Sequence, residues 1–191
     1  ALTMLIDAYH DSPLRGLSAS DYQRRLKGAI ARNESAMANL DQHYVIDRQH
    51  EFLNDRQEII ADRAGSVIDA HGDLRPEHVY LIDSPVIVDR LEFNGELRVL
   101  DPVDELAFLA IECERLSAGW IGDFAFACYR DRTGDAPLEA LIAFYKSLRA
   151  CMRVRLALGH LIEPLQERCS PWFNLAEHYA AMALDQTAEM A

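Results

Sequence analysis

Apolar residues recur at helical spacing through the first third of the chain. The spacing predicts a short helix over residues 2–11, which Ser12-Pro13 ends. Two further periodic patterns predict a long helix over residues 18–43 and another over about 46–62. The first pattern has no capping residue before it, so we expect the chain to continue upstream in its parent protein.

The period changes after Gly65. Short runs rich in β-branched residues at 66–70, 78–82 and 86–93 predict strands, and the turn residues 83–85 predict a tight hairpin between the last two. Helical patterns then return and cover residues 104–116, 122–134, 137–162 and 171–186. The outline predicts a mostly α-helical α+β fold with an embedded β-hairpin.

Composition narrows the class of protein. The 191 residues suffice for one domain with a sizeable core, and half of them are apolar. The net charge of −12 argues against a protein whose main task is gripping nucleic acid, because phosphate binding requires a basic face. We find neither an apolar run long enough to cross a membrane nor a basic N-terminal segment typical of a signal peptide.

Four cysteines are spread through the second half of the chain, at Cys113, Cys128, Cys151 and Cys169. They form no C-x-x-C pair, so the spacing does not indicate a zinc site or a thioredoxin-like redox pair. We expect free thiols that pack as small apolar side chains, which is typical of a reducing cytoplasm.

The stretch "VIDAHGDLRPEHVYLI", residues 67–82, places a polar cluster between two runs that are expected to be buried. Buried charges must be paired, neutralised or used. His71-Gly72-Asp73-Leu74 with a polar residue, His78, five positions after the aspartate has the form of a phosphotransferase catalytic loop. The predicted hairpin then returns an acidic side chain to that loop.

Residues 71–116, "HGDLRPEHVYLIDSPVIVDRLEFNGELRVLDPVDELAFLAIECERL", resemble the aminoglycoside phosphotransferase family of the kinase-like fold. They are closest to an uncharacterised branch with HGDL, EFN and ELAFL motifs. Residues 2–13 and 144–157 resemble two helices of the same branch, so the similarity extends from about residue 2 to 158. It implies that residues 1–191 are one kinase-like C-terminal lobe, with ATP as co-substrate and Mg²⁺ at the phosphates.

The resemblance also implies roles for individual residues. Asp73 would be the catalytic base, and His71 would be a structural residue of the loop. Glu92, 19 residues beyond Asp73, is preferred over Asp89, 16 residues beyond it, as the acidic magnesium ligand. His78 stands where the family has a magnesium-binding Asn.

Imidazole binds transition metals better than it binds magnesium. His78 therefore either weakens the metal site, or Glu77 or a water molecule supplies the ligand in its place. Asp73 has its own alternative, as the N-cap of a short helix that begins near Pro76. Asp101 and Glu105 match a downstream acidic pair that would tie the loop to the next helix.

Arg149 and Arg153 lie four residues apart on one predicted helix, with Lys146 nearby. They could receive an anionic group of the substrate or nucleotide, or they could be solvated helix charges. The sequence contains no Gly-rich phosphate loop and no strand-borne lysine of the kinase type. These features belong to an N-terminal lobe, which we expect to precede this chain as its partner.

Three functions follow as hypotheses. The leading one is ATP-dependent and magnesium-dependent transfer of phosphate to a hydroxyl of a small molecule by the intact parent, with this lobe alone nearly inactive. The second is a degenerate kinase-like binding module without catalysis. The third is a hydrolase that uses a transition metal held by His71, Asp73, His78 and Glu92.

Overall fold

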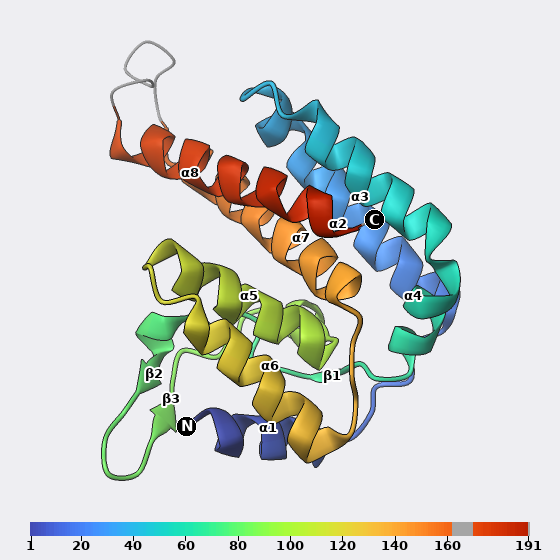
Figure 1. Cartoon of the computed structure of the whole chain (residues 1–191), viewed down its shortest axis with the longest axis vertical. Coiled ribbons are helices and arrows are strands. Elements are labelled where there is room, and N and C mark those ends of the chain that lie inside the picture. Colours follow the sequence, from blue (N-terminus) through green and yellow to red (C-terminus); the bar gives the residue numbers. More distant parts are fainter. Residues whose placement is uncertain (162–169, 191) are drawn as a thin grey trace.

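The computed structural model describes residues 1–161 and 170–190, and this part of the chain is mostly helical, as the sequence predicts (Figure 1). The α-helices are α1 (Leu2–His10), α2 (Ala19–Ala38), α3 (His43–Asp55), α4 (Gln57–Ala64), α5 (Pro102–Arg115), α6 (Trp120–Thr133), α7 (Glu139–Leu158) and α8 (Pro171–Asp185). The strands are β1 (Ile68–Asp69), β2 (Val79–Tyr80), β3 (Val86–Ile87) and β4 (Val99–Leu100). The 3₁₀ helices η1 (Pro76–His78) and η2 (Gly95–Arg98) precede β2 and β4, and η4 (Gln186–Met190) follows α8.

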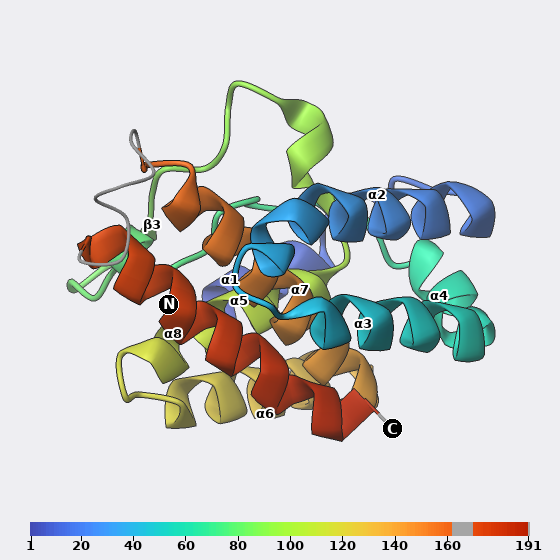
Figure 2. The same cartoon turned by 90° about the horizontal axis from the view of Figure 1, so that it is seen from above.

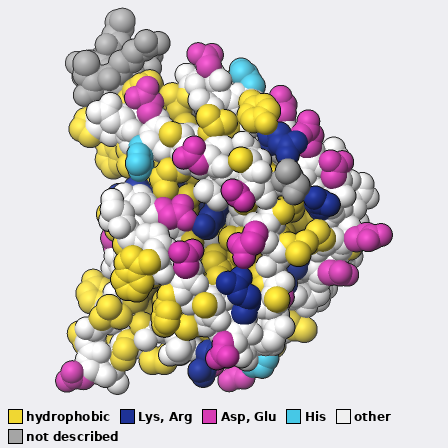
Figure 3. Space-filling model, viewed as in Figure 1, with side chains coloured by type: hydrophobic (Ala, Val, Ile, Leu, Met, Phe, Trp, Pro, Cys, Tyr) yellow, Lys and Arg dark blue, Asp and Glu magenta, His cyan; other side chains and the backbone are white. Residues whose placement is uncertain are grey.

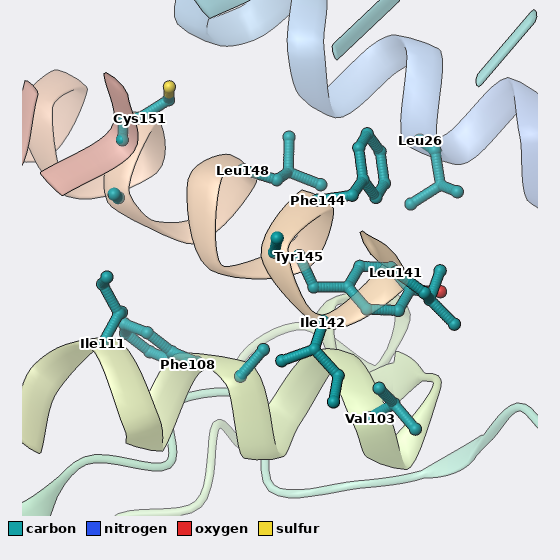
Figure 4. Packing of buried hydrophobic residues seen from close by; sticks show 14 of the residues in the cluster. Leu26, Val103, Phe108, Ile111, Leu141, Ile142, Phe144, Tyr145, Leu148 and Cys151 are labelled. Atoms are coloured by element: carbon teal, nitrogen blue, oxygen red, sulfur yellow. The ribbon is translucent and has the colours of Figure 1, made fainter. Parts of the chain in front are cut away.

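Helix α7 runs through the middle of the molecule and packs against α2, α5 and α8 (Figures 1 and 2). Its apolar face buries Phe144, Tyr145 and Leu148, and α5 contributes Phe108 from the other side (Figure 4). Phe144 also stacks on Phe52 of α3, with ring centroids 4.7 Å apart. The core therefore lies among the helices, where the sequence periodicity placed the apolar stripes.

The strands form two separate antiparallel pairs. In the hairpin, Val79 pairs with Ile87 and Tyr80 with Val86, so residues 81–85 form the turn (Figure 1). The expected hairpin is confirmed, but its strands are two residues long rather than spanning 78–82 and 86–93. The second pair joins β1 to β4, a strand that the sequence pattern did not predict because two apolar residues are too short a signal.

The helix expected over residues 46–62 is two helices. Arg56 leaves the helical backbone conformation (φ −113°, ψ 35°) and separates α3 from α4. Neither Gly nor Pro marks this break, so the apolar periodicity predicted one continuous helix across it. Helix α5 begins two residues before the expected start at 104: Asp101 caps it by accepting a hydrogen bond from the Val103 N–H at 2.9 Å, and Pro102 is its first residue.

The described cysteines, Cys113, Cys128 and Cys151, are free thiols, whereas Cys169 lies outside the described residues. None of the helices in residues 1–161 and 170–190 is long and apolar enough to span a bilayer. Acidic side chains are spread over the face seen in Figure 3 and outnumber the basic ones there, in keeping with the negative net charge.

Candidate active site

The loop that carries Asp73 is anchored by Glu105 of α5. The Glu105 carboxylate is fully buried and accepts hydrogen bonds from the backbone N–H groups of His71 at 2.6 Å and Gly72 at 2.7 Å. It also accepts a hydrogen bond from the Tyr9 hydroxyl of α1 at 3.0 Å. Burial raises the pKa of Glu105, and the positive charge of Arg149 and these donors oppose that rise. The loop start is therefore attached to two helices.

His71 joins the loop to the end of the hairpin. Its Nδ1 accepts from the Asp73 N–H at 3.3 Å, so the ring proton is on Nε2, which donates to the Val88 carbonyl at 2.8 Å. Both ring nitrogens are thus used within the protein. This geometry agrees with a structural role for His71 and leaves no nitrogen for a metal or for acid–base work.

Asp73 has a partly exposed carboxylate at the centre of the loop. Arg75 donates to its Oδ2 from Nε at 3.2 Å. The short helix η1 begins at Pro76 with Arg75 at its N-cap position, and no side chain caps it. The alternative in which Asp73 serves as the N-cap is therefore wrong, and the carboxylate is free of a capping role.

His78 lies between two carboxylates. Its Nδ1 donates to the Asp73 carbonyl at 2.8 Å and lies 3.9 Å from the Asp73 carboxylate. Its Nε2, on the other side of the ring, is 3.2 Å from Oδ2 of Asp89 and 3.1 Å from Nη2 of Arg75. The buried imidazole thus occupies the space between Asp73 and Asp89, and both of its nitrogens are engaged.

Asp89, and not Glu92, is the hairpin carboxylate that the structure brings to this loop. Strand β3 ends at Ile87, and Asp89 adopts a left-handed conformation (φ 63°) that turns its side chain toward His78. Glu92 is exposed, and within the described residues its side chain makes neither a hydrogen bond nor an ion pair. The preference for Glu92 rests on its separation from Asp73 along the chain, as the resemblance implies, and that separation does not set where a side chain points after a strand that ends at Ile87.

The donor set suits a hard cation better than a transition metal. Asp73 and Asp89 offer carboxylate oxygens, and Mg²⁺ is commonly held by one or two carboxylates together with substrate phosphates and water. No three His, Cys, Asp or Glu side chains of residues 1–161 and 170–190 are grouped as a metal site. The four-residue transition-metal set of the hydrolase hypothesis is therefore not assembled in the described structure.

Asp101 is a buried structural residue. It accepts two hydrogen bonds from Arg63 of α4, at 2.6 and 2.7 Å, and a third from the Tyr145 hydroxyl at 3.0 Å. Burial raises the pKa of Asp101, and the Arg63 charge opposes the rise. Asp101 therefore joins α4, α5 and α7, and its hydrogen-bond partners within the described residues do not include the loop. The tie between the loop and α5 that was expected of both acidic residues is made by Glu105.

The three basic residues of α7 that could have received an anion are already paired. Arg149 is buried and forms a bidentate ion pair with Asp104, at 2.7 and 3.0 Å. Arg153 lies 2.9 Å from the buried carboxylate of Glu112, and Lys146 binds Glu114 at 2.6 Å. These contacts connect α5 to α7, so the three side chains are already paired within the protein, and the buried Arg149 is not the solvated helix charge of the alternative either.

Comparison with known proteins finds relatives without an assigned function. An uncharacterized protein of Mycobacterium bovis and two from Mycobacterium tuberculosis strains are each 40% identical over 93 residues. The matched stretch covers 48% of this chain and 19% of each relative, so the chain spans a small part of the curated proteins it matches. No protein-family model matches the sequence. No solved structure matches it either.

Proposed function

We propose that this chain is the large lobe of a kinase-like phosphotransferase that, within a longer protein, transfers phosphate from ATP to a hydroxyl of a small molecule. One observation supports the proposal above all: the His78 imidazole lies between Asp73 and Asp89, 3.9 Å from the Asp73 carboxylate and 3.2 Å from the Asp89 carboxylate. Residues 16 positions apart thus present two carboxylates on one small surface.

In the proposed reaction Asp73 orients the acceptor hydroxyl and takes its proton as the hydroxyl oxygen attacks the phosphoryl group. Asp89 would hold Mg²⁺, which neutralises charge on the phosphates when it is bound. His78 acts as a positioning residue, because its Nδ1–H donates to the Asp73 carbonyl and its Nε2 accepts from Arg75, the residue that is paired with the Asp73 carboxylate. Arg75 must release Asp73 when substrate arrives, and such a partly exposed ion pair is weak, about 0–1 kcal/mol.

In this proposal Asp89, and not Glu92, is the acidic metal ligand. The assignment is tested with Mn²⁺, a paramagnetic substitute for Mg²⁺, by NMR on this chain. Mn²⁺ should selectively broaden resonances of Asp73, His78 and Asp89, Mg²⁺ should reverse the broadening, and Asp89→Asn should weaken it about tenfold or more. Glu92→Gln is the matched control and should leave it unchanged; the opposite pattern would return the metal to Glu92.

Activity is expected only with the N-terminal lobe present. Positioning of the nucleotide accounts for most of the rate in this chemistry, and in the proposal this chain supplies the large lobe without the lobe that holds the nucleotide. In the intact parent, Asp73→Asn should lower kcat by a factor of about 10² or more while nucleotide binding persists. Magnesium-dependent phosphorylation by this chain alone would contradict the proposal that the N-terminal lobe is required for activity.

A second candidate function is a binding module without catalysis. Two observations favour it. The Arg75 guanidinium forms an ion pair with the Asp73 carboxylate, and His78 stands where the resembled family has a metal-binding Asn. Calorimetry of the intact parent with ATP separates the two functions. A catalytic protein should bind ATP more tightly when Mg²⁺ is added, whereas a degenerate module should bind weakly or without dependence on the metal.

A further inference from the structure

Three arginines from separate segments converge on the carboxylate of Asp69, which is not one of the two carboxylates of the candidate active site. Arg15, in the loop after α1, lies 2.8 Å from Oδ2 of Asp69. Arg90, after the hairpin, and Arg98, in η2, each lie 2.8 Å from Oδ1 of the same residue. Asp69 is in β1, so the cluster is built on the strand that leads into the catalytic loop.

The cluster carries excess positive charge. Three guanidinium groups and one carboxylate leave a local charge of +2, although the whole chain carries −12. The nearby acidic residue of η2, Glu96, does not neutralise it, because Glu96 is paired with Arg25 of α2. A concentrated positive charge of this kind is costly to assemble unless an anion compensates it.

Hydrogen bonds hold Arg90 and Arg98 in place, and the side chains of Arg15 and Arg90 are partly exposed. Arg90 donates from Nε to the Ala70 carbonyl at 2.9 Å and from Nη2 to the Asp69 carbonyl at 2.8 Å. Arg98 donates to the Leu91 carbonyl at 2.6 Å. The side chains of Arg15 and Arg90 are nevertheless 48% and 47% exposed, whereas that of Arg98 is 18% exposed. Fixed, partly exposed guanidinium forks are the usual means of binding a phosphate group.

We propose that Arg15, Arg90 and Arg98 form a binding site for the phosphate group of a small-molecule anion. A phosphate dianion matches the local charge of +2 and offers oxygens to several N–H donors at once. The proposal stands on the cluster alone and does not depend on the phosphotransferase function.

Occupation of this site would act on the neighbouring loop. Arg90 directly follows Asp89, and the next residue, Leu91, donates its N–H to the His71 carbonyl at 3.1 Å. An anion that holds Arg90 against Arg15 therefore restrains the segment that carries Asp89. The amide of Leu91 should exchange more slowly with solvent when phosphate is bound.

The test is a titration of this chain with inorganic phosphate, followed by NMR of the arginine Nε–H groups, with sodium chloride at equal ionic strength as reference. Phosphate should give saturable shifts at Arg15, Arg90 and Arg98 that chloride does not give. Arg15→Ala should weaken binding about tenfold or more, because it removes charge-assisted hydrogen bonds. Arg24→Ala is the control, since Arg24 is an exposed arginine of α2 paired with Asp21, and it should leave the affinity unchanged.

The variant Asp69→Asn distinguishes a phosphate-binding site from a cluster with a purely structural role. Removing the internal carboxylate should tighten phosphate binding several-fold if an anion is the natural ligand, whereas loss of binding would overturn the proposal. Equal shifts with chloride, or equal effects of the Arg15 and Arg24 variants, would also overturn it. AMP distinguishes the sources of the phosphate: tighter binding of AMP than of inorganic phosphate supports a nucleotide ligand, and weaker binding supports free phosphate.

Discussion

Glu105 holds the backbone of His71: its buried carboxylate accepts the His71 N–H at 2.6 Å from the first turn of α5, although the two residues are 34 positions apart in the chain. The other carboxylate oxygen accepts the Gly72 N–H. Two successive N–H groups of an irregular loop would otherwise be buried without partners, which is costly. The position of Asp73, one residue farther along, thus depends on a side chain that takes no part in the proposed chemistry.

We predict that Glu105→Gln lowers the free energy of unfolding by about 2 kcal/mol, measured by urea denaturation. The amide has one acceptor oxygen, so its NH₂ group must face a buried backbone N–H. Tyr9→Phe removes only one donor and leaves both backbone bonds intact, so it should cost about 1 kcal/mol. Equal losses in the two variants would show that the backbone contacts are not the main contribution.

Replacing two helical glycines by alanine should change the stability of the protein in opposite directions. A Cβ at Gly122 of α6 would lie 2.7 Å from the Cβ of Ala110 on α5, so Gly122→Ala must push the two helices apart and should cost about 1–3 kcal/mol. Gly28 of α2 has only the end of the Arg32 side chain nearby, at 3.5 Å. Gly28→Ala should therefore stabilise the protein by about 0.5–1 kcal/mol, through helix propensity. Thermal unfolding of both variants checks the pair, and a stabilised Gly122 variant would contradict the close packing of α5 and α6.

The arginine cluster predicts a specific pH dependence. Arg98, with Arg15 and Arg90, lowers the pKa of Asp69 from its ordinary 3.8 to about 2. Because the folded-state pKa is depressed, the stabilisation is present above the unfolded-state pKa and is lost as pH falls through about 2. The difference in unfolding free energy between the native chain and Asp69→Asn should thus shrink between about pH 4 and pH 2. A difference that stays constant over this range would contradict the ion pairs.

The buried pair of Arg149 and Asp104 should show strong coupling. Arg149→Met leaves Asp104 buried and unpaired, so it should cost about 3–5 kcal/mol. Adding Asp104→Leu should recover most of that loss, because two apolar side chains replace the pair. A double-mutant cycle in urea measures the coupling, and additive losses would indicate that the two residues do not interact.

Periodicity alone located most of the helices, because a helix that covers a core must repeat its apolar residues every three or four positions. Tyr22, Leu26 and Ile30 of α2 are all buried as their spacing requires. The polar loop was also visible in the sequence, since charged residues between apolar runs are unusual. Both signals are local, and local patterning needs no knowledge of distant residues.

Only the tertiary structure decided which carboxylate meets the loop. The choice of Asp89 over Glu92 depends on a two-residue strand and a left-handed turn, which spacing along the chain does not encode. The arginine cluster on Asp69 likewise joins residues 54, 21 and 29 positions away from it. Sequence sets local conformation through short-range sterics and apolar periodicity, whereas contacts between distant polar groups arise from how the packed helices bring their ends together.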